Sequence, residues 1–292
     1  MAKKIVAVVG ATGAQGRGVV DQLVADGTFD ARALTRNPEA YSGPAQEVHA
    51  VNLSDEGALA KAFEGAFGVF AVTNFWEGAD EVQQGTNAVN AARAAGVNRF
   101  IWSSLPNVED ISGGAFDVPH FTGKAKVDAL VRNGGFEFGG VVQPPFYYQN
   151  FTGMLAPQPK EDGSVGWTLP LDPTKKVIHM GDISELGKVV VGLLKSNAVS
   201  NSDGPYAFSA ELKSFNEILA DYAAQGQKFS YTQVPADIFA GFFEGAKEIA
   251  EMLAYFEAHT YMGPDADANI KRGADVAIGP FTPFAQWLKA QS

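Results

Sequence analysis

Strand-like and helix-like hydrophobic patterns alternate along the first 143 residues of this 292-residue chain, and the alternation predicts its fold class. Six short apolar runs are each separated by segments with helical spacing, which is typical of a parallel sheet with helices on both faces. A glycine-rich turn follows the first apolar run, as in Rossmann-type proteins. The sequence therefore predicts an α/β protein: a Rossmann-type parallel sheet at 1–143 and a smaller C-terminal substrate or lid subdomain at 144–292.

Each expected strand is a short apolar run bounded by turn residues or by a helical pattern. The helices between these strands keep apolar residues on one face, and Ser54 is expected to cap one of them. Gly27, Gly65 and Gly96 each follow a helical segment and are expected to end it. A further helix is marked by Val127, Leu130 and Val131. The strands are expected at 5–9, 31–34, 47–51, 69–72, 100–102 and 138–142.

The second half lacks this strict alternation and is predicted to be an α+β subdomain. We expect it to close a cleft at the carboxyl edge of the sheet and to be interleaved with strands that return to the sheet. Its helices are expected at 182–194, 214–224 and 235–258, with a short strand at 206–208. The third helix carries Phe239, Phe242, Phe243, Met252, Leu253 and Phe256, so we expect it to line an apolar cleft together with residues 144–175.

The composition argues against several classes of protein. The net charge is −11 with 22 Lys and Arg, whereas a nucleic-acid binder needs clustered cations to displace counterions. The chain has no cysteine, which rules out disulfides and cysteine-based zinc sites, and its four histidines show no metal-ligand spacing. No apolar run approaches the ~20 residues of a membrane span, and no signal peptide is recognised. We therefore expect a cytoplasmic protein without a metal, a nucleic-acid partner or a membrane.

The glycine-rich turn predicts a phosphate site. Gly10, Gly13 and Gly16 stand between an apolar strand and an amphipathic helix, and glycines let the backbone approach a pyrophosphate closely. The start of the helix offers backbone N–H donors and a favourable dipole. The residues expected to contact a dinucleotide here are Gly10, Thr12, Gly13, Ala14, Gln15 and Gly16.

The end of the second strand predicts which dinucleotide binds. NAD-preferring proteins usually carry Asp or Glu there to hold the ribose 2′-hydroxyl. Here the strand ends with Thr35 and Arg36, and a guanidinium pairs well with a 2′-phosphate. We therefore predict NADP(H) as the cofactor, with Thr35 as an additional hydroxyl donor.

Four stretches of the sequence together resemble a known family. They are Val-Val-Gly10-Ala-Thr-Gly-Ala-Gln-Gly16, Ala33-Leu-Thr-Arg36-Asn-Pro, Val69-Phe-Ala-Val-Thr73-Asn-Phe-Trp-Glu77 and His120-Phe-Thr-Gly-Lys124. The chain resembles the NmrA-like family of atypical short-chain dehydrogenases/reductases from residue 4 to about 290. The likeness is closest to the NADPH-sensor branch exemplified by HSCARG, and isoflavone reductase-like proteins are related.

The resemblance implies roles for particular residues. Asn52 and Leu53 would border the adenine, and the segment Thr73, Asn74 and Phe75 would line the middle of the cofactor. Lys124 would bond the nicotinamide ribose. The loop from Phe146 through Tyr147 to Asn150 would pass close to the nicotinamide.

The catalytic pattern of ordinary short-chain dehydrogenases is only partly present. Their serine matches Ser103, and their lysine matches Lys124, but the tyrosine four residues before it is replaced by His120. Residues at i and i+4 share one helix face. Three interpretations stay open: His120 donates a proton, Lys124 acts as the acid or base, or no hydride chemistry takes place.

Two functions follow from these patterns. The first is an NADPH-dependent reductase of a small apolar or aromatic substrate, with Lys124 and His120 as candidate catalytic residues. The alternative is an NADP(H)-responsive sensor that acts on a regulatory protein partner without hydride transfer. The sequence predicts neither the substrate nor the oligomeric state.

Overall fold

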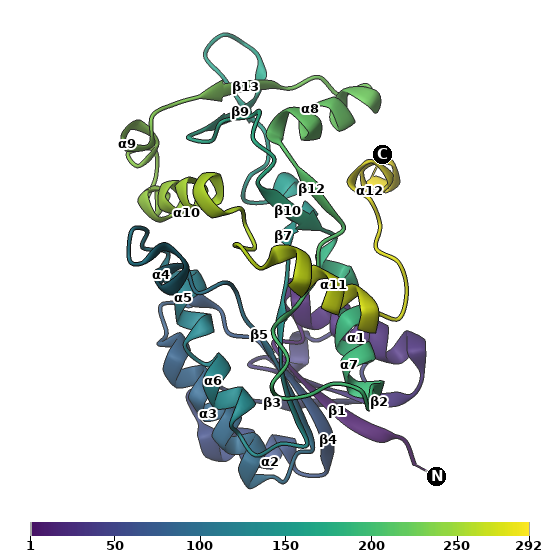
Figure 1. Ribbon diagram of the computed structural model, residues 1–292. Helices are drawn as coiled ribbons and strands as arrows, with labels where there is room; N and C mark the ends of the chain where they lie inside the picture. Colours follow the sequence, from purple (N-terminus) through teal and green to yellow (C-terminus); the bar gives the residue numbers. More distant parts are fainter. Residues whose placement is uncertain (1, 292) are drawn as a thin grey trace.

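The computed structural model describes residues 2–291, and a seven-stranded parallel sheet forms its central layer (Figure 1). The strand order β11-β6-β5-β4-β1-β2-β3 places β2 and β4 on either side of β1. The Rossmann-type sheet predicted from the sequence is thus confirmed. The strands are β1 Lys4–Val9, β2 Phe29–Thr35, β3 Glu47–Ala50, β4 Ala66–Ala71, β5 Arg99–Ser103, β6 Phe138–Gln143 and β11 Tyr206–Ala207.

Helices cover both faces of the sheet because successive residues of a strand point to opposite sides. Val6 and Val8 of β1 pack in one apolar cluster with α1 (Ala14–Asp26) and α7 (Leu186–Lys195). Ala7 and Val9 pack in the other with α2, α3 and α6. The helices on that second face are α2 Glu56–Phe63, α3 Glu81–Ala94 and α6 Asp128–Arg132.

The C-terminal part stands at one end of the sheet and has its own aromatic core (Figure 1). It holds two three-stranded sheets, ordered β12-β10-β7 and β13-β9-β8. Their strands are β7 Phe146–Tyr147, β8 Gln158–Pro159, β9 Val165–Leu169, β10 Ile178–Gly181, β12 Glu211–Lys213 and β13 Ser230–Gln233. The remaining helices are α4 Val108–Ser112, α5 Pro119–Ala125, α8 Phe215–Ala224, α9 Ala236–Phe239, α10 Ala246–His259, α11 Ala266–Val276 and α12 Phe284–Gln291. Within residues 2–291 no helix has the length and apolar character needed to cross a bilayer.

The chain returns to the large sheet after building part of the second region. β11 pairs in parallel with β6, α7 packs on α1, and α11 packs on both β11 and α7. Residues from beyond position 143 therefore complete the edge and one face of the Rossmann-type sheet. The boundary between residues 143 and 144 stays a prediction.

Three local predictions were wrong. The single helix expected at 235–258 is two helices, because the chain turns at Gly245, whose φ is +88°. Phe242 and Phe243 lie in that break, are half exposed and are not part of the cavity that residues 144–155 line together with Ile249 and Met252 of the second of these helices. Helix α2 is capped by Asp55, whose side chain accepts from the Ala58 N–H, and not by Ser54 as predicted.

The contact between α11 and β11 gives a test of this architecture. A Cβ at Gly273 would lie 2.0 Å from the Ala207 carbonyl oxygen, so Gly273→Ala forces α11 away from the edge strand. We expect the free energy of unfolding to fall by about 1–3 kcal/mol, as for other overpacked sites.

Gly57→Ala in α2 is the matched control, because a Cβ there meets only ordinary contact at 3.5 Å. It should leave the protein as stable as wild type or raise the stability by about 0.5–1 kcal/mol. Chemical denaturation measures both variants. Equal stabilities of the two variants would contradict the described packing of α11.

Candidate functional site

The glycine turn after β1 is built for close approach of a ligand to the backbone. Gly10 has φ +71°, and its carbonyl oxygen accepts the Gly13 N–H at 2.9 Å. A Cβ at Gly16 would lie 2.2 Å from the same oxygen, so only glycine fits there. Thr12, Gly13 and Ala14 are exposed, and no side chain among the described residues caps the start of α1. The first-turn N–H groups of α1 can therefore receive an anion.

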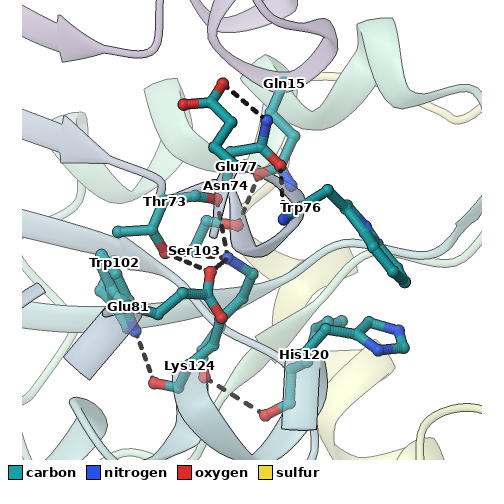
Figure 2. Close-up of polar contacts among 12 residues, drawn as sticks. Gln15, Thr73, Asn74, Trp76, Glu77, Glu81, Trp102, Ser103, His120 and Lys124 are labelled. Atoms are coloured by element: carbon teal, nitrogen blue, oxygen red, sulfur yellow. Dashed lines mark hydrogen bonds and ion pairs between the residues drawn. The ribbon is translucent and has the colours of Figure 1, made fainter. Parts of the chain in front are cut away.

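Arg36 follows β2 and is met by a carboxylate that no sequence pattern indicated. Its guanidinium nitrogens donate to the two oxygens of Glu77 at 2.5 and 2.8 Å. The amide of Asn74 also donates to Glu77, at 2.9 Å (Figure 2). Thr35 is buried, and its hydroxyl oxygen accepts the Asn37 N–H. The predicted phosphate-binding arginine thus already has an anionic partner.

The two residues expected to border an adenine lie beyond β3. Asn52 is exposed, and its side-chain oxygen accepts the Ser54 N–H at 3.0 Å. The carbonyl oxygen of Leu53 accepts from the side chain of Asn87 in α3, at 2.9 Å. Both lie near the carboxyl edge of the sheet, since they follow β3 directly.

Lys124 on α5 is held in a buried cluster with Thr73, which follows β4, and with Glu81 of α3 (Figure 2). Its Nζ donates to the carbonyl oxygen of Thr73 at 2.8 Å, to the Thr73 hydroxyl oxygen at 2.9 Å and to Glu81 Oε1. The Thr73 hydroxyl in turn donates to Glu81 at 2.7 Å. An ammonium group has three N–H donors, and all three are used here.

Burial and charge act against each other at this lysine. Burial lowers the pKa of Lys124, and the Glu81 carboxylate opposes that shift. Glu81 is 5% exposed, and its Oε2 has no hydrogen-bond partner among the residues described. Trp102 donates its indole N–H to the Lys124 carbonyl oxygen at 3.0 Å and so ties α5 to β5. The Lys124 side chain is thus fixed by three acceptors around its Nζ.

Ser103, at the end of β5, belongs to a second chain of hydrogen bonds. Its hydroxyl donates to Gln15 Oε1 at 2.5 Å, and Gln15 Nε2 donates to the Tyr147 hydroxyl oxygen at 2.7 Å. Burial raises the pKa of Tyr147 to about 12, and the Gln15 contact opposes this only in part. Tyr147 is therefore a neutral phenol at physiological pH. This chain of hydrogen bonds joins the start of α1, the end of β5 and β7.

His120 begins α5 and pairs with a residue 128 positions away in the sequence. Its Nδ1 lies 2.5 Å from Oε1 of Glu248 in α10, and its backbone N–H donates to the same oxygen at 3.2 Å. Burial acts to raise the pKa of Glu248, but the hydrogen bond and charge of His120 outweigh it and the pKa is lowered. An ionised carboxylate only accepts, so Nδ1 carries the hydrogen. No hydrogen bond to Nε2 is found within residues 2–291.

A cavity of about 160 Å³ lies at the carboxyl edge of the sheet, and several of the residues described above line it. His120, Lys124 and Gln15 supply its polar lining, together with the predicted loop residues Tyr147 and Asn150. The ring of Trp76 lies 5.3 Å from that of His120, between centroids, and stands at the same cavity (Figure 2). The apolar lining consists of Leu105, Phe121, Pro144, Pro145, Phe146, Met154, Leu155, Ile249 and Met252.

Phe75, predicted to line the cofactor, faces a different cavity. That cavity, of about 510 Å³, lies between the start of α3 and α5 and also contacts Glu81 and Thr122. Thr73 is likewise turned into the buried lysine cluster. Across residues 2–291, no group of three or more metal-ligating side chains comes together.

The candidate residues missed by the sequence are three carboxylates. Glu77, Glu81 and Glu248 each contact one of the predicted residues Arg36, Lys124 and His120. Glu81 follows the helix cap Asp80, where an acidic residue is expected for the helix dipole alone. The three carboxylates lie 41 to 128 residues away from their partners in the sequence, so no local sequence pattern predicts these contacts.

The strand order and the glycine turn define the chain as a Rossmann-type α/β protein with an added C-terminal part. The sequence profile of the NmrA-like family matches residues 2–288, and the chain belongs to this family. The family predicted from the four sequence stretches is confirmed. The NmrA-like oxidoreductase FrzB of Cladobotryum sp. is 29% identical over 324 residues, covering 98% of this chain and 96% of FrzB.

Solved structures share the fold over nearly the whole length. The negative transcriptional regulator NmrA in complex with NADP has a TM-score of 0.80 at 23% identity, covering 98% of this chain and 94% of NmrA. The NADPH-dependent quinone oxidoreductase QOR2 of Escherichia coli, solved with NADPH, has a TM-score of 0.74 at 18% identity, covering 98% and 99%. At these identities the likeness establishes the fold.

The buried ion pair gives a test of the site's construction. Lys124→Met leaves the Glu81 carboxylate buried without its ammonium partner, so we expect the free energy of unfolding to fall by about 3–5 kcal/mol. Adding Glu81→Gln removes the uncompensated charge and should recover about half of that loss or more. Chemical denaturation of the single and double variants measures both effects. A double variant no more stable than Lys124→Met would contradict this account.

Proposed function

We propose that this protein is an NADPH-dependent reductase of a small apolar or aromatic molecule. The observation that carries the proposal is the cavity of about 160 Å³ in which His120, held by Glu248, meets an apolar lining beside Gln15 at the start of α1. Such a combination of an apolar pocket with few polar groups is typical of small-molecule sites.

The residues of the glycine turn fit a dinucleotide. The close approach at Gly16 leaves the start of α1 open to a pyrophosphate. Arg36 would meet the 2′-phosphate, because a guanidinium pairs well with a phosphate. The NADPH bound to QOR2 supports this choice, whereas NmrA is solved both with NADP and with NAD. Gln15 and Tyr147 would lie beside the nicotinamide end, because both stand at the cavity.

The proposed reaction needs a hydride and a proton. NADPH, when bound, supplies the hydride. His120 is the proposed proton donor, because an imidazole exchanges protons near neutral pH and its Nε2 is not engaged within the described chain. Glu248 holds Nδ1–H and so orients the ring. Lys124 is a poorer donor, since each of its three N–H groups already has an acceptor.

The lining of the cavity suggests the substrate class. Phe146, Ile249 and Met252 present apolar surface, and Trp76 flanks the imidazole. A planar or apolar acceptor of hydride suits this environment. Quinones, enones, aldehydes and imines are therefore the substrates to test, with quinones first because QOR2 acts on them.

The first test is steady-state NADPH oxidation against that panel. We expect turnover of at least one class by the wild type. His120→Asn should lower kcat about 100-fold or more with the Kd for NADPH unchanged, because general acid catalysis contributes about 10²–10⁴-fold. Glu248→Gln should lower kcat by a smaller factor.

His49→Asn provides the matched control, because His49 is exposed on β3 and pairs only with Glu47. Its kcat should equal that of the wild type. Full activity of His120→Asn would mean that a group other than His120 donates the proton to the substrate. An NADPH-binding protein that turns over no member of the panel would argue against the reductase.

The second candidate function is an NADP(H)-responsive regulator without hydride transfer. Two observations favour it: the lysine cluster is saturated by Thr73 and Glu81, and the similar protein NmrA is a negative transcriptional regulator. A regulator must bind the cofactor with different affinity in two states. Light scattering with and without NADPH tests this function, since a cofactor-dependent change in assembly with no turnover would support it.

A further inference from the structure

The ion pair between Arg36 and Glu77 spans the phosphate-binding edge of the sheet. Arg36 follows β2, and Glu77 belongs to the 3-10 helix Phe75–Glu77 that follows β4. Since β2 and β4 are the two neighbours of β1, the two side chains meet across the end of β1, where the glycine turn begins. The pair therefore lies where a nucleotide ribose would leave the turn.

The pair engages both terminal nitrogens of the Arg36 guanidinium. Both Glu77 oxygens accept from Arg36, at 2.5 and 2.8 Å, and this fork is the arrangement that a phosphate would also use. A 2′-phosphate carries about two negative charges and would stand beside the carboxylate unless Glu77 moved away. The carboxylate thus competes with the phosphate for Arg36.

The Glu77 carboxylate could instead bind the adenosine ribose of NAD(H), which has a 2′-hydroxyl in place of the phosphate. A ribose 2′-hydroxyl is a hydrogen-bond donor, and a carboxylate near the end of the second strand is the usual acceptor for it in NAD-binding proteins. Here the end of β2 offers no acidic residue, but Glu77 reaches that place from the 3-10 helix after β4, on the other side of β1. Asn74 donates to Glu77 Oε1 and holds the carboxylate there (Figure 2).

We propose that Glu77 is a specificity-determining residue that occupies Arg36 against the 2′-phosphate of NADP(H) and accepts the ribose 2′-hydroxyl of NAD(H). The proposal rests on the proposed function, in which Arg36 holds the 2′-phosphate. Its consequence is that this chain discriminates between the two dinucleotides less than an unpaired arginine would allow. Arg36 and Glu77 side chains are 67% and 39% exposed, so the pair is screened by water and can open.

The test is the Kd of NADPH and of NADH, measured by fluorescence titration. Glu77→Gln should bind NADPH about 5- to 10-fold more tightly than wild type, the size expected for release of one partly exposed ion pair. The same variant should bind NADH equally or a few-fold more weakly. Arg36→Ala should bind NADPH about 100-fold more weakly and leave NADH within about 3-fold.

Glu39→Gln is the matched control, because Glu39 is an exposed acid three positions after Arg36 that has no contact with the guanidinium. It removes the same charge from the neighbourhood, so an equal gain in NADPH affinity would overturn the specific role of Glu77. An unchanged NADPH-to-NADH ratio in Glu77→Gln, with Arg36→Ala impaired, would overturn this inference and leave the proposed cofactor standing. Failure of the wild type to bind either dinucleotide would overturn the proposed function itself.

Discussion

The buried ammonium of Lys124 constrains the arrangement of the whole candidate site. It is 8% exposed, and a charge at that depth needs an acceptor for every N–H and a counter-ion beside it. Thr73 meets this need from the segment after β4 and Glu81 from α3, while α5 carries the lysine itself. Three elements are thereby held together around one group. The position of His120 at the start of α5, and so the polar side of the cavity, follows from that attachment.

The candidate site contains three carboxylates, and their surroundings differ. Glu81 is buried with an ammonium, Glu248 is half-buried with an imidazole, and Glu77 is solvated with a guanidinium. The depth of each pair decides what it can do. The Lys124–Glu81 pair, the deepest, is structural, because removing one partner leaves the other as an uncompensated buried charge. The Arg36–Glu77 pair, the most exposed, can exchange its anion. The intermediate pair orients a ring without fixing its second nitrogen.

The sequence predicted the parts of the fold that depend on local patterns. Apolar runs such as 5–9 and 138–142 became strands, and Pro119, His120 and Lys124 share one helix as their spacing required. The break at Gly245 was missed because helical periodicity on both sides of it is compatible with one helix. The carboxylate partners were missed for a different reason. Each is set by tertiary packing between segments far apart in the chain, and no spacing rule encodes that proximity.

The return of β11 to the edge of β6 has a consequence for how the protein is made. A nascent polypeptide that has emerged only as far as β6 presents an unpaired strand edge and a sheet face that lacks α7. Synthesis must proceed some sixty residues further, to Tyr206–Ala207, before that edge is covered. Until then the incomplete chain exposes apolar surface and an unpaired strand edge, and such surfaces are what chaperones protect.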